Sequence, residues 1–131
     1  MTGIYTIVSS PDRSGSGTNT IIVGSGIEGA SVIDPTVADL AHLEAIIHAA
    51  ESRGGIRRIL ITRGHTGAMD GAQTLRQKLG VHIYAWSFKS VPFAHFEMSD
   101  GMQVPAGSEM LRAIHLSNAL FFFGLELFFD K

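Results

Sequence analysis

The chain has 131 residues, of which 45% are hydrophobic and 17% are charged, and its formal net charge is -2 at pH 7. This length predicts a single domain over residues 1–131, with enough apolar material for a core and no basic excess to favour nucleic acid or an anionic membrane. The absence of cysteine excludes disulfides, thiolate metal sites and cysteine nucleophiles. No signal peptide or membrane-spanning stretch is recognisable, so we expect a cytoplasmic protein.

The first predicted elements form a hairpin. Residues 9–17 (SSPDRSGSG) have the composition of a loop, and Thr18 to Asp34 predicts two strands, TNTIIVG and ASVID, joined by a turn. That turn, GSGIEG, matches Gly-x-Gly-x-x-Gly, the fingerprint of dinucleotide-binding loops. Such a loop must open a helix, whereas a strand follows here, so we interpret the glycines as a hairpin turn.

A helix and a buried strand come next. Thr36 can cap a helix in which apolar residues recur at helical spacing from Leu40 to Ala50, and Gly54 or Gly55 can end it. Residues 56–62 (IRRILIT) have the continuous apolar character of a strand that is covered on both faces. His42 and His48 lie six residues apart on the helix, and we expect both on its surface.

The rest of the sequence predicts a turn over residues 64–70, a short helix that ends at Gly80, and further strands. The strands cover VHIYAW, MLRAIHL and two very apolar segments on either side of Gly124. The order β-β-α-β-α-β, followed by more strands, predicts an α+β fold with a mixed β-sheet and helices on one face.

Several sequence blocks follow one another as they do in a known family. GTNTIIVG, SVIDPT, HLEAII, RRILITRGHTGAMDGAQTLRQKLGVHIYA, SDGMQVP and LRAIH resemble, in order and spacing, the metallo-β-lactamase superfamily in its branch of glyoxalase II-like hydrolases and β-lactamase-like ribonucleases. The resemblance runs from about Gly17 to the C-terminus. It implies about the first half of the family's αββα sandwich, and we expect the second half to be absent.

The resemblance also places a metal motif. In this family the turn after the ILIT strand carries His-x-His-x-Asp-His, which supplies ligands to zinc. These four positions fall on Arg63, His65, Gly67 and Ala68, so His65 alone keeps a ligand side chain. Arg63 adds a fixed positive charge where a cation would sit. We therefore expect no metal and no other cofactor.

Three more residues correspond to site positions of the family. His115 lies just before the turn that normally holds another ligand, whose position falls near Ala119, and Asp130 is the candidate for a bridging Asp. Asp34 corresponds to an Asp that braces the metal-bearing turn, and without metal we expect it to cap the next helix. The residues of this vestigial site are Arg63, His65, Asp34, His115 and Asp130.

A weaker metal site is an open alternative. His82 and His115 lie in predicted strands, and either could approach His65 closely enough to bind a metal weakly. Strand histidines whose ring nitrogens are satisfied by hydrogen bonds are the commoner case, so the alternative is a minor one.

The segment ALFFFGLELFFD sends apolar side chains to both faces of its sheet. Half of a sandwich would leave one sheet face bare, and a two-fold homodimer would cover it by packing sheet on sheet. The predicted interface consists of Phe121, Phe122, Phe123, Leu125, Leu127, Phe128 and Phe129.

We predict a non-catalytic relative of these hydrolases, acting as a homodimeric binding or structural module. Its small-molecule ligand is unidentified, and neither nucleic acid nor membrane is expected as a partner. The alternative is a zinc-dependent hydrolase with a rebuilt site around His65, His115 and Asp130, completed by a partner chain. A third hypothesis is that a second protein supplies the other half of the fold.

Overall fold

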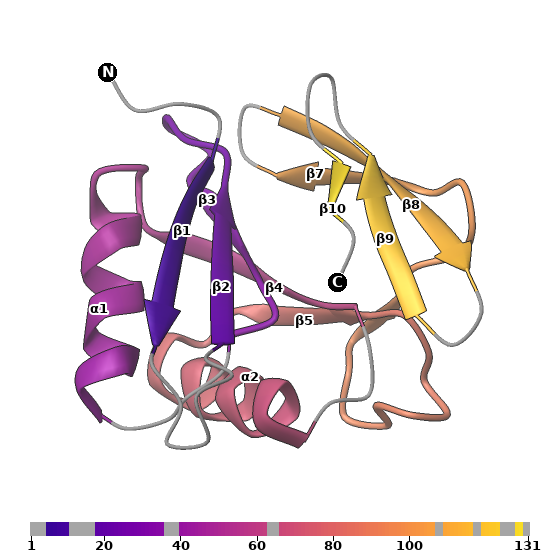
Figure 1. The fold of residues 1–131 in the computed structure, drawn as a ribbon, viewed down its shortest axis with the longest axis horizontal. Helices are drawn as coiled ribbons and strands as arrows, with labels where there is room; N and C mark the ends of the chain where they lie inside the picture. Colours follow the sequence, from indigo (N-terminus) through magenta and orange to yellow (C-terminus); the bar gives the residue numbers. More distant parts are fainter. Residues whose placement is uncertain are drawn as a thin grey trace.

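The structure is a computed structural model that describes residues 5–10, 18–35, 40–62, 66–106, 109–116, 119–123 and 128–129. Figure 1 shows the arrangement of the elements. Their order is β1 (Tyr5–Ser10), β2 (Thr18–Val23), β3 (Ala30–Ile33), α1 (Leu40–Glu51), β4 (Ile56–Ile61), α2 (Thr66–Leu79), β5 (His82–Ala85), β6 (Phe96–Glu97), β7 (Gln103–Ala106), β8 (Glu109–Leu116), β9 (Ala119–Phe123) and β10 (Phe128–Phe129).

The first sheet is mixed, with strand order β1-β2-β3-β4-β5-β6. The predicted hairpin is confirmed, because β2 and β3 pair antiparallel through Ile21↔Ile33 and Ile22↔Val32. From β3 to β6 all neighbours run parallel. β1 is an addition to the predicted elements. Its sequence YTIVSS contains β-branched residues that favour a strand.

Both helices cover one face of this sheet, as predicted (Figure 1). On β4 the alternation is clear, because Ile59 and Ile61 pack with the helices while Leu60 faces the other way. α2 begins at Thr66, so the expected turn over residues 64–70 is wrong from Thr66 onward, and residues 64–65 lie outside the described residues. Among the described residues, no helix is long and apolar enough to cross a membrane.

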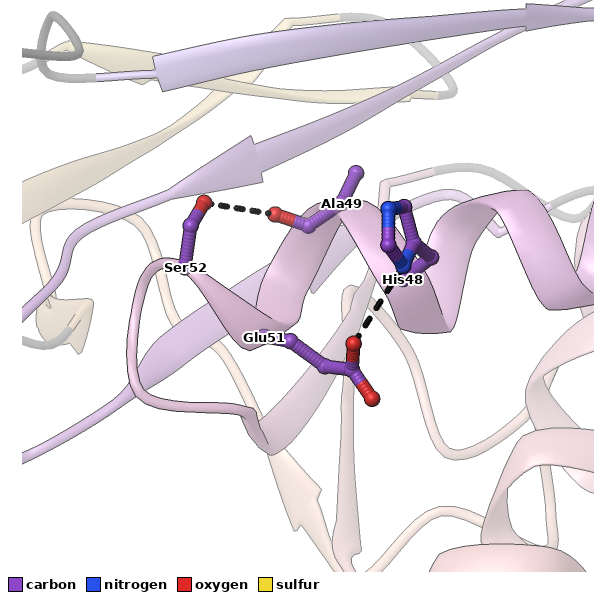
Figure 2. A network of polar contacts seen from close by, with 4 residues as sticks. All are labelled: His48, Ala49, Glu51 and Ser52. Carbon is purple, nitrogen blue, oxygen red and sulfur yellow. Dashed lines mark hydrogen bonds and ion pairs between the residues drawn. The ribbon is translucent and has the colours of Figure 1, made fainter.

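The two histidines of α1 differ. His42 is 5% exposed, so the expectation of a surface residue is wrong there. It precedes the buried Ile46 by one helical turn and therefore lies on the same face. His48 is exposed as expected, and its Nδ1 lies 3.3 Å from a carboxylate oxygen of Glu51 (Figure 2). Ser52 donates to the carbonyl of Ala49 at 3.3 Å in the last turn.

A second sheet, with order β10-β9-β8-β7, packs on the face of the first sheet that the helices leave free. Its contacts bring together Ile21, Val23, Ile33 and Leu60 from the first sheet with Met98, Val104, Leu111 and Ala113. The expectation that the Phe-rich segment joins the helix-covered sheet is therefore wrong. The same chain folds back as a meander and covers the face that was expected to be bare.

The edges of the two sheets differ in length. β6 and β10 have two residues each, and β7 contains Pro105, which has no N–H to offer. β1 is six residues long and pairs with β2 on one side only.

Candidate functional site

The parallel strands β3 to β6 end at one side of the first sheet, which we call the carboxyl edge. Asp34 follows β3, Thr62 follows β4, Trp86 follows β5 and Met98 follows β6. Open α/β sheets bind ligands outside the carboxyl ends of their strands. The predicted metal motif begins at Arg63, directly after Thr62 in the sequence.

Asp34 is held in an unusual backbone conformation. Its φ of 52° lies in the left-handed region, and it is the one non-glycine residue of the described chain with a positive φ. Its N–H donates to the carbonyl of Leu60 at 2.8 Å, and its own carbonyl accepts from the Thr20 hydroxyl at 3.3 Å. These bonds fix a conformation that tends to persist at functional sites.

The carboxylate of Asp34 binds the end of β4. The Thr62 N–H donates to Oδ1 at 2.8 Å, and the Thr62 hydroxyl donates to Oδ2. Both residues are buried. This pair, which we call the Asp34–Thr62 clamp, fixes the end of β4, directly before the predicted metal motif in the sequence. Residues 36–39, which a helix cap would involve, lie outside the described residues, so the capping role stays a prediction.

The other sequence candidates are only partly placed. Arg63, His65 and Asp130 lie outside the described residues. His115 belongs to β8, where it stands opposite Leu120 of β9. Gly67 and Ala68, at two ligand positions of the family motif, belong to the first turn of α2.

His82 does not reach the carboxyl edge. It pairs with Arg58 at the opposite end of β4, four residues before Thr62, which corresponds to about 13 Å along a strand. His65 lies outside the described residues, so the minor alternative in which His82 joins it at a metal site stays a prediction.

The family's zinc site does not fit the described part of this edge. Structural and catalytic zinc sites use three or four protein ligands. Gly67 and Ala68 carry no donor atoms in their side chains, and the described residues contain no group of three His, Asp or Glu that could hold a metal ion.

A shallow pocket of about 410 Å³ lies at the carboxyl edge beyond β5 and β6. Its lining consists of Trp86, Ser87, Glu97, Met98, Ser99 and Asp100. An oxygen of the Glu97 carboxylate accepts the Phe88 N–H at 2.8 Å. Sequence reasoning missed this pocket. The signals were the tryptophan at the end of VHIYAW and the two acids around Met98.

Trp86 is the anchor of the pocket. Its backbone N–H donates to the carbonyl of Ile61 at 3.1 Å, and its side chain packs against both hydrophobic clusters. The indole nitrogen is buried and makes no hydrogen bond. Buried donors without a partner are rare in folded proteins, so this one marks a locally unfavourable arrangement.

At the amino end of the parallel strands, the polar groups are paired. Arg53 is fully buried and donates from Nη1 to the carbonyl of Gly24 at 3.0 Å, and burial lowers its pKa. Gly54 (φ 92°) lies so close to the hairpin turn that a Cβ would overlap the Gly26 carbonyl oxygen. The turn before β4 and the β2–β3 turn are thus locked together.

His95 forms a second contact near this end. Its Nδ1 accepts the Ile83 N–H at 2.9 Å, and its Nε2 faces the Arg76 Nε–H at 3.1 Å. The His95 and His82 rings lie 4.7 Å apart. Burial, and then the charges of Arg76 and His82, lower the pKa of His95, because each disfavours a second positive charge.

No family model matches the sequence, and no curated protein is similar to it. Among solved structures, ETHE1 from Myxococcus xanthus matches with a TM-score of 0.71 at 17% identity, covering 91% of this chain and 53% of that one. A metallo-β-lactamase from Staphylococcus aureus matches with a TM-score of 0.69 at 20% identity, covering 93% and 38%.

A third match is a metallo-β-lactamase from Cronobacter sakazakii described by its HARLDQ motif. The TM-score is 0.67 at 20% identity, with 91% of this chain and 56% of that chain covered. The chain thus spans about half the length of the structures that it matches. It has the fold of the metallo-β-lactamases, and the resemblance drawn from its sequence is confirmed at the level of the fold.

Proposed function

We propose that this chain is a binding module with a metallo-β-lactamase fold that lacks a hydrolytic metal centre. The observation that carries the proposal is a contrast at the carboxyl edge. The Asp34–Thr62 clamp is formed, whereas Gly67 and Ala68 stand at ligand positions without donor atoms. In this proposal the Asp34–Thr62 clamp is retained, and it holds the shape of a binding surface instead of a metal site.

The clamp supports this proposal physically. A left-handed Asp and a buried carboxylate cost free energy, about 1–3 kcal/mol for the backbone conformation alone. Two hydrogen bonds from Thr62 and one from the Asp34 N–H to Leu60 offset that cost. The edge therefore holds its shape through protein–protein hydrogen bonds.

The competing proposal is a zinc-dependent hydrolase with a site rebuilt around His65, His115 and Asp130. It needs ligands beyond the described residues, because these contain no group of three His, Asp or Glu that could hold a metal ion.

Metal analysis of the purified protein decides between them. After incubation with zinc and removal of free metal, we expect no stoichiometric zinc in the wild type. The proposal is overturned by one zinc per chain that His65→Ala removes and that His48→Ala, at the exposed histidine of α1, retains.

We also propose a two-fold homodimer that packs through the outer face of the second sheet. On β8, Leu111 and Ala113 face the first sheet, whereas Met110 is 49% exposed and Arg112 is exposed. The register pairs the strand of Phe121 to Phe123 with β8, and β10 extends the same sheet. Leu125 and Leu127 of the predicted interface lie outside the described residues.

Sedimentation velocity tests the dimer. We expect a dimer for the wild type at micromolar concentration and a shift toward monomer for Met110→Glu, because a charge would enter an apolar contact. A wild type that is monomeric at these concentrations contradicts the proposal.

A further inference from the structure

The pocket beyond β5 and β6 has a one-sided charge. Its lining contains the carboxylates of Glu97 and Asp100 and no lysine or arginine. Both acids are solvent-exposed, and their negative charge draws cations and repels anions. The pocket therefore discriminates by charge before any detailed contact forms.

Glu97 is positioned before a ligand arrives. One oxygen of its carboxylate accepts the Phe88 N–H at 2.8 Å, which orients the group against the loop after β5. A carboxylate that is already oriented loses little side-chain entropy when it meets a cation, so its contribution to binding is larger than that of a freely rotating acid.

Trp86 contributes to the lining of the pocket without its hydrogen-bond donor. Its indole nitrogen is buried, so the solvent-accessible part of this residue does not include the N–H group. The ring is held by packing on both hydrophobic clusters. Tryptophan is the side chain whose face attracts cations most strongly, and quaternary ammonium groups are bound in proteins by aromatic rings beside acids.

We infer that this pocket binds a small molecule through an alkylammonium group, with Trp86 as the apolar wall and Glu97 and Asp100 as the counter-charges. Its volume of about 410 Å³ lies at the small end of the range for ligand sites, which suits a small molecule with one alkylammonium group. The inference rests on the proposed binding function and names the ligand class for it.

The experiment uses the only tryptophan of the chain, whose fluorescence reports on the pocket without a label. The full chain is titrated with choline and, in parallel, with 3,3-dimethylbutan-1-ol, which has the same shape without the charge. We expect a saturable change with choline at millimolar concentration or below, and none with the neutral alcohol.

Matched variants locate the effect. Glu97→Gln keeps an acceptor for the Phe88 N–H and removes the charge, so the choline affinity should fall about tenfold, which equals about 1.4 kcal/mol. Asp100→Asn should act in the same direction. Glu51→Gln, at the exposed carboxylate of α1, should leave the affinity unchanged.

Two results overturn the inference: an equal response to the neutral alcohol, or a choline response that survives Glu97→Gln and Asp100→Asn together. A response to Ca²⁺ that Glu97→Gln abolishes, in a chain that gives no response to choline, also overturns it, because the site would then hold a metal ion. Each of these results is independent of the zinc measurement, which alone decides whether the proposed function fails.

Discussion

The two ends of the parallel strands β3 to β5 are built differently. At the amino end, the buried Arg53 is paired with Gly24, and Gly54 packs directly on the hairpin turn. At the carboxyl end, Asp34 has a left-handed backbone and Trp86 has a buried N–H without a partner. These strands are therefore closely packed at one end, whereas the other end holds a strained backbone and an unsatisfied hydrogen-bond donor.

Under the proposed function, the amino end stabilises the fold and the carboxyl end serves a ligand. Local departures from favourable geometry persist where the surrounding structure compensates for them, and they gather at functional sites. We therefore expect substitutions at the amino end to act mainly on stability. Substitutions at the carboxyl end should act both on stability and on the shape of the edge.

The largest expected effect is at Gly54. Gly54→Ala forces a Cβ onto the Gly26 carbonyl oxygen and a side chain into a left-handed backbone, which should cost about 3–5 kcal/mol of unfolding free energy. Gly55→Ala is the matched control, because its φ is also positive and no atom lies within 4 Å of its Cβ, so about 1–2 kcal/mol is expected. Urea unfolding measures both, and equal losses would mean that the two turns are not locked together.

The next effect concerns the clamp at the carboxyl edge. Asp34→Ala leaves the buried Thr62 N–H and hydroxyl without their acceptor, at an expected cost of about 2–4 kcal/mol. Asp34→Asn keeps an acceptor and tolerates the positive φ, so about 1–2 kcal/mol is expected. If Asp34→Ala is neutral in denaturant unfolding, the carboxyl edge is not held by this pair.

A smaller effect is expected at Trp86. Trp86→Phe loses part of the ring packing and also removes a buried donor that has no partner, and these changes oppose each other. The net change in unfolding free energy should stay within about 1 kcal/mol, whereas fully buried aromatic residues usually cost more on truncation. A loss well above that would show that the indole N–H is satisfied in solution.

The smallest expected effect is the pH dependence that His95 contributes. Its pKa is lower in the folded than in the unfolded protein, so the unfolded state takes up the proton first as the pH falls below about 6.5. Stability from this group is therefore complete above that pH and decreases on acidification. His95→Gln should flatten the profile of unfolding free energy between pH 7.5 and 5, and an unchanged slope contradicts this assignment.

Much of the fold could be predicted because its elements carry local signals. The glycines of the turn predict the β2–β3 hairpin, and the apolar residues Ile59 to Ile61 after the two arginines predict β4. The second sheet could not be predicted in this way. Its separation from the first depends on which faces meet in space, and the alternation of Leu111 and Ala113 with Met110 and Arg112 is the same whichever sheet β8 joins.

The candidate site also has one part that the sequence could predict and one part that it could not. The resemblance gave Asp34 as a candidate whose family counterpart braces the turn, and we expected a helix cap here; the structure shows its carboxylate bonded to Thr62. The pocket at Trp86 is assembled from the ends of β5 and β6, which are separated by a loop of ten residues (86–95). Hydrophobic periodicity predicts single helices and strands, and it does not predict that two separate segments lie side by side.

The unequal sheet edges have a consequence for handling the protein. Strands that end a sheet offer unpaired N–H and C=O groups to other molecules, and short strands or prolines reduce that risk. β6, β7 and β10 are protected in this way. β1 is the long edge of the described structure, so self-association of concentrated or partly unfolded samples should begin there, as intermolecular strand pairing along Tyr5–Ser10.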